Sequence, residues 1–196
     1  MSQENPSVGY YDRNASAFVR GTVGASMGEA LDAFSAMLPE RAHVLDWGCG
    51  SGRDSLELRK RGFEVTSVDA SSAIAEEALA ATQTIVRVET FDELDEVESY
   101  DGIWACASLL HVRPEELPNV LAKAHAALQP EGVLYCSFKY GIDAGVRNGR
   151  WFTNLNEDAL SELLLPLFHI DRMWVSADVR PGRSDERWLN CLATRR

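Results

Sequence analysis

Glycine occupies every second position of segment 48–52, which joins an apolar run at His43–Trp47 to a helical pattern at 53–61. A turn between a strand and a helix that lacks side chains lets a ligand lie against the backbone, and glycine tolerates the positive φ angles of such a turn. The glycine fingerprint of dinucleotide-binding proteins has a wider last gap, which would place its third glycine where this chain has Arg53. The turn therefore predicts an α/β ligand-binding unit and argues against an NAD-dependent oxidoreductase.

Strand patterns alternate with helical patterns along most of the chain. Strands are expected at 43–47, 63–68, 84–88, 100–106, 132–138, 168–177 and 187–194, and helices at 14–20, 28–38, 53–61, 71–81, 114–128 and 157–165. This alternation predicts an α/β fold with a doubly wound, mostly parallel seven-stranded sheet and helices on both faces. A short connection joins the last two strands, so the last strand should run antiparallel to its neighbours.

No repeat, low-complexity tract or Pro/Ser-rich linker divides the 196 residues, so we expect a single domain over 1–196. Hydrophobic residues make up 45% of the chain and charged residues 25%, which is ordinary for a globular protein with a sizeable core. Segment 1–40 has apolar side chains at helical spacing. We expect it to form a helical amino-terminal lid segment.

The chain carries thirty acidic and nineteen basic residues, which gives a formal net charge of −11. A nucleic-acid partner normally requires a basic surface, so this charge favours a small-molecule substrate over RNA or DNA. The amino terminus lacks the basic start and apolar run of a signal peptide, and no apolar stretch is long enough to span a bilayer. These features predict a cytoplasmic protein without a membrane partner, acting as a monomer or a homodimer.

Four cysteines are scattered along the chain without paired spacing: Cys49, Cys106, Cys136 and Cys191. The last three lie in apolar, strand-like runs, which is typical of free buried cysteine. A zinc site would need closely spaced ligand pairs. The sequence therefore predicts free thiols and no metal centre.

Two aspartates accompany the glycine turn. Asp46 lies two residues before its first glycine, and Asp69 ends the second predicted strand, where a carboxylate can accept hydrogen bonds from both ribose hydroxyls of a bound nucleoside. Segments 44–55 and 65–71 resemble the first two motifs of class I S-adenosylmethionine (SAM)-dependent methyltransferases, and 100–111 is similar to their fourth-strand motif. The resemblance covers almost the whole chain. Segments 10–12, 137–141 and 148–150 are also similar to the tellurite-resistance-related methyltransferases.

The resemblance implies which residues hold SAM. The glycine turn would cradle the methionine part, Asp46 would orient the turn or meet the amino group, and Asp69 would hold the ribose. The complete set of implied cofactor-binding residues is Asp46, Gly48, Cys49, Gly50, Gly52, Asp69, Ala70, Phe91, Ala105 and Cys106.

Within this set, Ala70 and segment 90–92 would flank the adenine, whereas Ala105 and Cys106 would offer backbone groups near the sulfonium. Many relatives have an acidic residue just after the third strand, which binds the adenine amino group. A threonine and a phenylalanine occupy that place here, so the sequence does not identify the residue that binds the adenine amino group.

Three side chains are predicted to line the space beyond the transferable methyl carbon, because substrates of such sheets bind beyond the carboxyl ends of the strands. His111 follows the fourth strand and is a candidate base or substrate ligand, with a packed histidine as the alternative. Lys139 follows the fifth strand. Tyr11 belongs to the amino-terminal segment and could close over the pocket, with ordinary packing as the alternative.

Four arginines are expected in two loops: Arg147 and Arg150 after the fifth strand, and Arg180 and Arg183 between the last two strands. Together with Lys139, these cations would suit a carboxylate or oxyanion acceptor, and solvated loop arginines are the alternative. The sequence thus predicts methyl transfer from SAM to a small-molecule acceptor, with S-adenosylhomocysteine as product. The cations named above are compatible with an anionic acceptor.

Two other functions remain compatible with the motifs, because binding motifs do not report which carbon next to the sulfur is attacked. One is a SAM-using enzyme that does not methylate, for example by cyclising the aminobutyryl arm of SAM. The other is a non-catalytic SAM-binding module, which would bind SAM without producing S-adenosylhomocysteine.

Overall fold

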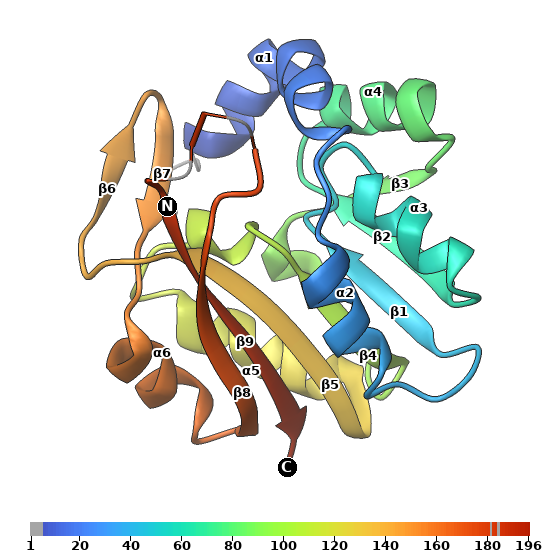
Figure 1. Cartoon of the computed structure of the whole chain (residues 1–196), viewed down its shortest axis with the longest axis vertical. Coiled ribbons are helices and arrows are strands. Elements are labelled where there is room, and N and C mark those ends of the chain that lie inside the picture. Colours follow the sequence, from blue (N-terminus) through green and yellow to red (C-terminus); the bar gives the residue numbers. More distant parts are fainter. Residues whose placement is uncertain (1–5, 181, 184) are drawn as a thin grey trace.

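The computed structural model describes residues 6–180, 182–183 and 185–196. Seven strands form one sheet in the order β3-β2-β1-β4-β5-β9-β8, and helices cover both of its faces (Figure 1). The strands of this sheet are β1 His43–Trp47, β2 Glu64–Asp69, β3 Val86–Val88, β4 Tyr100–Ala105, β5 Leu128–Lys139, β8 Phe168–Ala177 and β9 Arg187–Arg195. Strands β1 to β5 pair in parallel, whereas β9 runs antiparallel to both β5 and β8. The predicted mostly parallel sheet with an antiparallel last strand is confirmed.

The helices agree with the sequence pattern in number and order, with shifts at their ends. They are α1 Pro6–Thr22, α2 Gly28–Ser35, α3 Arg53–Lys60, α4 Ser72–Thr82, α5 Leu117–Ala127 and α6 Glu157–Leu164, with short 3-10 helices η1 Phe91–Glu93 and η2 Leu109–His111. Helix α1 begins eight residues before the predicted helix at 14–20, and the first five residues of the expected lid segment lie outside the described part.

The core lies on both faces of the sheet because the central strands are covered on both sides. On one face, Phe34 of α2 and Leu58 of α3 pack with Val44 and Trp104. On the other, α5 and α6 cover the next residue of β1, Leu45. Successive strand residues point to opposite faces, and both kinds are apolar here, as expected for buried parallel strands.

A two-stranded hairpin follows β5 and corrects one sequence expectation. Strands β6 Ala144–Arg147 and β7 Arg150–Thr153 pair antiparallel, with Arg147 opposite Arg150, where the sequence analysis placed a loop. The turn consists of Asn148 with φ 50° and Gly149 with φ 77°. An Asn-Gly pair tolerates this conformation, and it matches the twist of the two strands. The hairpin therefore holds Arg150 on a paired strand.

Helix α1 lies across the carboxyl ends of the parallel strands and reaches the hairpin (Figure 1). Ala15 and Val19 pack on Ile74 of α4. At the other end, the Trp151 backbone N–H of β7 donates to the Ser7 hydroxyl at 3.0 Å. The amino-terminal segment thus covers the edge of the sheet where the sequence analysis expects a ligand. No described helix combines the length and apolarity needed to cross a bilayer.

Candidate active site

A cavity of about 490 Å3 lies at the carboxyl ends of the central strands, between α1, the β6–β7 hairpin and the connection from β8 to β9. Ligands of open α/β sheets bind at this edge, and the volume is typical of a small-molecule site. Side chains from distant parts of the sequence line the cavity: Tyr11, Phe18, Asp46, Arg53, Asp69, Phe91, Cys106, His111, Lys139, Arg150, Phe152, Asp178 and Trp188.

The glycine turn forms one wall of the cavity. Gly48, Gly50 and Gly52 have φ angles of 81°, 54° and 71°, which glycine adopts without steric cost. The N–H groups of Gly48 and Cys49 donate to the Val68 carbonyl at 2.8 and 2.9 Å, which fastens the turn to β2. A Cβ on Gly48 would lie 2.4 Å from Ser108 Cβ. The turn therefore presents bare backbone to the cavity at Gly48 and Gly50, as the methionine part of SAM would require, whereas Gly52 does not line the cavity.

Asp69 links the turn to the start of α4. Its two carboxylate oxygens accept hydrogen bonds from the Gly50 and Ser71 N–H groups, each at 3.0 Å. Burial raises the pKa of Asp69, while these backbone bonds act in the opposite direction. A carboxylate oxygen has two lone pairs, so Asp69 can still accept hydrogen bonds from a ligand in the cavity. This arrangement fits a ribose diol.

Asp46 is a buried acid at the end of β1, with 2% of its surface exposed. The Ser55 hydroxyl donates to its carboxylate at 2.5 Å. Burial, followed by the charge of Asp54, raises the pKa of Asp46 to about 7, although the Ser55 bond opposes this shift. A positively charged ligand group beside it would favour the ionised form. The amino group of SAM, which Asp46 is predicted to contact, is a positively charged group of this kind.

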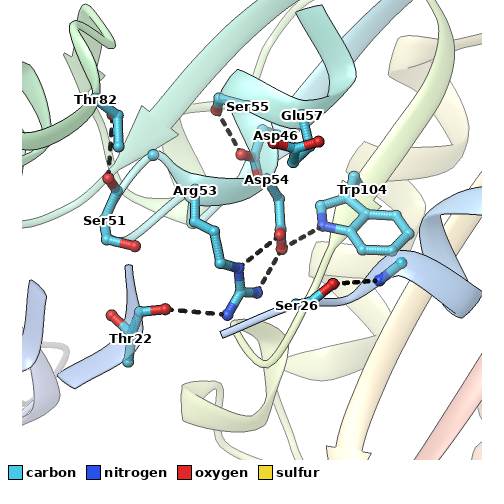
Figure 2. Close-up of polar contacts among 12 residues, drawn as sticks. Thr22, Ser26, Asp46, Ser51, Arg53, Asp54, Ser55, Glu57, Thr82 and Trp104 are labelled. Carbon is cyan, nitrogen blue, oxygen red and sulfur yellow. Dashed lines mark hydrogen bonds and ion pairs between the residues drawn. The ribbon is translucent and has the colours of Figure 1, made fainter. Parts of the chain in front are cut away.

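A charged pair that was not predicted from the sequence lies at the start of α3. Arg53 donates twice to the Asp54 carboxylate, at 2.7 and 2.8 Å, and once to the Thr22 carbonyl at 3.5 Å. The indole N–H of Trp104 also donates to Asp54 at 3.0 Å (Figure 2). Both residues of the pair line the cavity. The pair connects the end of α1 to the glycine turn, and its signal in the sequence was a charged dipeptide directly after the last glycine.

Tyr11 and His111 meet in the cavity although one hundred positions separate them. The Tyr11 hydroxyl lies 2.9 Å from His111 Nε2, and His111 Nδ1 lies 2.6 Å from the Trp151 carbonyl. A carbonyl can only accept, so Nδ1 carries the proton and Nε2 accepts from Tyr11. Burial, with the charges of Arg150 and Lys139, lowers the pKa of His111 to about 4. His111 is therefore neutral near pH 7 and held in one tautomer.

Lys139 lines the cavity, and it is already part of an ion pair. Its ammonium group lies 2.5 Å from the Glu186 carboxylate and also faces the rings of Phe152 and Trp188 at 5.5 and 5.7 Å. The ion pair lowers the pKa of Glu186. This geometry makes Lys139 a fixed positive charge in the wall of the cavity.

The remaining predicted cofactor residues divide into two groups. Cys49, Ala70, Phe91 and Cys106 line the cavity. Ala105 is fully buried in the core and does not line it. Two residues directly after Cys106 also line the cavity, although they were not predicted from the sequence. They are Ala107, which has a φ of 53°, and Ser108, whose hydroxyl donates to the Trp47 carbonyl at 2.6 Å. No described group of three or more His, Cys, Asp or Glu side chains could hold a metal ion.

Comparisons with known proteins agree with this geometry. Residues 18–173 match the family described as a methyltransferase domain. A methyltransferase of uncharacterised function from Staphylococcus carnosus is 30% identical over 141 residues, which cover 66% of this chain and 68% of that protein. Trans-aconitate 2-methyltransferase from Deinococcus radiodurans is 34% identical over 103 residues, which cover 50% of this chain and 39% of the relative.

Solved structures share the whole fold. The 1,6-didemethyltoxoflavin-N1-methyltransferase of Burkholderia thailandensis, solved with 1,6-didemethyltoxoflavin and S-adenosylhomocysteine, is 25% identical with a TM-score of 0.75, covering 96% of this chain and 84% of that one. A TehB-like SAM-dependent methyltransferase from Corynebacterium glutamicum has a TM-score of 0.71 at 18% identity and covers 96% and 100% of the two chains. Against curated relatives from Bacillus subtilis, Rickettsia bellii and Deinococcus radiodurans, this chain spans less than half of their length.

Proposed function

Because the chain belongs to the methyltransferase domain family, we propose that it transfers the methyl group of SAM to a small-molecule acceptor. The observation that carries the proposal is the wall formed by the glycine turn and Asp69, where bare backbone and a buried carboxylate face one cavity. The relative from Burkholderia thailandensis, whose fold matches over 96% of this chain, was solved with S-adenosylhomocysteine. SAM supplies an electrophilic methyl group on a sulfonium, from which a neutral thioether leaves without a proton.

The protein's contribution to such a displacement is orientation. Holding two reactants in line supplies roughly 7–11 kcal/mol of the barrier reduction. Here the glycine turn and Asp69 would fix the methionine and ribose parts, and Phe91 would pack against the adenine. Phe91 is itself held by an edge contact with the Trp47 ring at a centroid distance of 5.0 Å. These supports make the cofactor half of the cavity a preformed surface.

Tyr11 and His111 offer a route for the acceptor's proton. When an acceptor O–H or N–H donates to the Tyr11 oxygen, the Tyr11 proton can pass to His111 Nε2, and the imidazolium that forms keeps its Nδ1–H bond to the Trp151 carbonyl. The low pKa of His111 is compatible with this role, because an acceptor becomes strongly acidic as its bond to the methyl group forms. We therefore assign proton removal to this pair.

Size and charge support a small, negatively charged acceptor rather than a nucleic acid. The cavity holds about 490 Å3, of which SAM would fill part. The chain has a net charge of −11, and acidic side chains also line this cavity, but Arg150 reaches it without a carboxylate partner among the ion pairs of the described residues, whereas Lys139, Arg180 and Arg183 are paired. Two relatives are named for methylating trans-aconitate and 1,6-didemethyltoxoflavin, both small molecules. The free thiols of all four cysteines fit a reducing compartment, and we propose the cytoplasm.

One experiment separates this function from its alternatives. The protein is incubated with SAM and a panel of small acids, and every SAM-derived product is resolved by mass spectrometry. Methyl transfer gives S-adenosylhomocysteine together with a methylated acid. Cyclisation of the aminobutyryl arm gives methylthioadenosine instead, and a binding module gives no product although calorimetry detects SAM binding. Methylthioadenosine as the product excludes the proposed function, and SAM binding without any product excludes methyl transfer to the acids of the panel.

A further inference from the structure

The cations that reach the cavity differ in whether the protein already neutralises them. Arg53 pairs with Asp54, Lys139 and Arg183 both pair with Glu186, and Arg180 pairs with Asp178 at 2.5 Å. Each of these side chains therefore has a carboxylate within ion-pair distance. Their positive charges are therefore neutralised by ion pairs within the walls of the cavity.

Arg150 has no such partner within the described ranges. No Asp or Glu oxygen there lies within ion-pair distance of it, and its buried Nε has no hydrogen-bond acceptor. Its nearest polar contact is the Tyr11 hydroxyl at 3.5 Å. The guanidinium instead faces the rings of Tyr10 and Phe152, with centroid distances of 4.7 and 4.9 Å. Aromatic faces hold a guanidinium in place and shield it from water, but they leave its in-plane donors available.

The position of Arg150 indicates which part of a ligand it faces. It begins β7 in the hairpin after β5, whereas the glycine turn lies at the end of β1, on the opposite side of the cavity edge (Figure 1). Arg150 is next to Tyr11 and contributes to lowering the pKa of His111, so it belongs to the proton-accepting end. A group bound there lies beside the reacting atom of the acceptor.

From these observations, and resting on the proposed function, we propose that Arg150 binds a carboxylate of the acceptor through the in-plane N–H donors that are not directed at the Tyr11 hydroxyl. A guanidinium binds a carboxylate through two parallel hydrogen bonds, which fix the orientation of the bound group as well as its charge. Because the other cavity cations are paired, the acceptor class is a small acid with one carboxylate at this position. Its nucleophilic atom would then lie beside the Tyr11 hydroxyl.

The test uses acetate as the probe, since it is small enough to reach the guanidinium whatever the rest of the acceptor looks like. Wild type, Arg150→Gln, Arg150→Lys and Arg147→Gln are titrated with sodium acetate, with and without S-adenosylhomocysteine, and binding is followed by the thermal unfolding midpoint. Acetamide with sodium chloride at equal ionic strength is the neutral comparison. Arg147 is the matched control, because it faces Arg150 across the same hairpin, pairs with Asp143 at 2.6 Å and does not line the cavity.

We expect acetate, but not acetamide, to stabilise wild type and Arg147→Gln. Apparent affinity for acetate should fall at least tenfold in Arg150→Gln and less in Arg150→Lys, which keeps the charge without the paired donors. An equal response of Arg150→Gln and Arg147→Gln to acetate overturns the proposal.

A second arm tests the cofactor's own carboxylate as the alternative source. Affinity for S-adenosylhomocysteine and for methylthioadenosine, which lacks the amino-acid part, should stay within about threefold in Arg150→Gln. Selective loss of S-adenosylhomocysteine affinity would assign Arg150 to the cofactor and overturn the proposal. Failure of wild type to bind S-adenosylhomocysteine would instead contradict the proposed function, whereas the acetate titration without cofactor still tests Arg150.

Discussion

Asp69 illustrates, at the scale of single residues, how one carboxylate can serve both the fold and a ligand. It accepts the N–H groups of Gly50 and Ser71, which ties the glycine turn to the start of α4. The remaining lone pairs face the cavity, where a ribose diol would complete the hydrogen bonding. Removing the carboxylate therefore affects the shape of the turn and the ligand contacts together.

We predict that Asp69→Ala weakens S-adenosylhomocysteine binding by about 1–3 kcal/mol, because buried donors are left unpaired. Calorimetry measures the affinity, and a thermal melt shows whether the variant is folded. Asp12→Ala is the control: Asp12 accepts the Ser71 hydroxyl at 2.6 Å but does not line the cavity, so its loss should leave the affinity nearly unchanged. Unchanged affinity in folded Asp69→Ala would exclude a ribose contact.

Tyr11 and His111 form the second residue-scale feature, a hydrogen-bonded pair that separates binding from chemistry. We predict that Tyr11→Phe and His111→Gln each lower turnover by roughly 10²–10⁴-fold, the range expected for loss of a general base, while SAM affinity stays within about tenfold. Steady-state kinetics on an accepted small acid and calorimetry with SAM provide the two measurements. Full turnover in both variants would make the pair a packing contact.

Helix α3 shows, at the element scale, how glycine acts at both ends of one helix for different reasons. Gly52 is its N-cap residue with φ 71°, and a Cβ there would lie 2.5 Å from Thr82 Oγ1 and 2.8 Å from Thr84 Cβ. Gly62 follows the other end with φ 93°, and a Cβ there would have no atom within 4 Å. The first glycine is required by conformation and close packing, the second by conformation alone.

These two glycines make a matched prediction. Gly62→Ala should lower the free energy of unfolding by about 1–2 kcal/mol, the cost of the left-handed conformation. Gly52→Ala adds a steric clash, so its cost should exceed that of Gly62→Ala by a further 1–3 kcal/mol, roughly the range for overpacking. Urea unfolding of both variants measures the difference. Equal losses would mean that Thr82 and Thr84 move aside without cost.

The sheet and its helices could be predicted because burial gives them long periodic patterns, and β1 and β8 agree with the predicted ranges at both ends. The β6–β7 hairpin was missed because each strand has only four residues, too few for a periodic pattern to stand out, and β6 is partly exposed whereas β7 is partly buried. Its turn did carry a signal, since Asn148-Gly149 is typical of a two-residue hairpin. Turn chemistry, rather than hydrophobic pattern, locates the strand that bears Arg150.

At the scale of the whole molecule, the site depends on contacts that sequence spacing does not reveal. Topology alone places His111 and Lys139 at the same edge of the sheet, which is why both could be chosen from the sequence. The Glu186 partner of Lys139 is 47 positions away, and Tyr11 and Arg150 meet across 139 positions. The sequence therefore does not reveal which cavity cations form ion pairs with carboxylates and which do not. The folded structure is needed for that.

Two buried groups in this cavity act in opposite directions on the pH dependence of stability. His111 has its pKa lowered from 6.5 to about 4, so between these values the unfolded chain binds a proton that the folded chain does not, and acidification destabilises the fold. Asp46 has its pKa raised from 3.8 to about 7, so over this range the folded chain binds the extra proton, and acidification stabilises the fold. The two effects largely cancel between pH 4 and pH 6.5.

Single variants should expose this cancellation in the ligand-free protein. Between pH 7 and pH 4, His111→Gln should gain stability relative to wild type, and Asp46→Asn should lose it, each by on the order of 3 kcal/mol if one pKa unit corresponds to 1.36 kcal/mol. Urea unfolding of wild type and both variants across this range gives the differences, and all other titrating groups are common to the three proteins. Because the amide oxygen introduced by Asp46→Asn can still accept the Ser55 hydroxyl, this substitution removes the titration while keeping that hydrogen bond. Parallel curves for wild type and His111→Gln would mean that His111 titrates normally in the fold, and a neutral imidazole accepting from Tyr11 near pH 5 would then be ruled out.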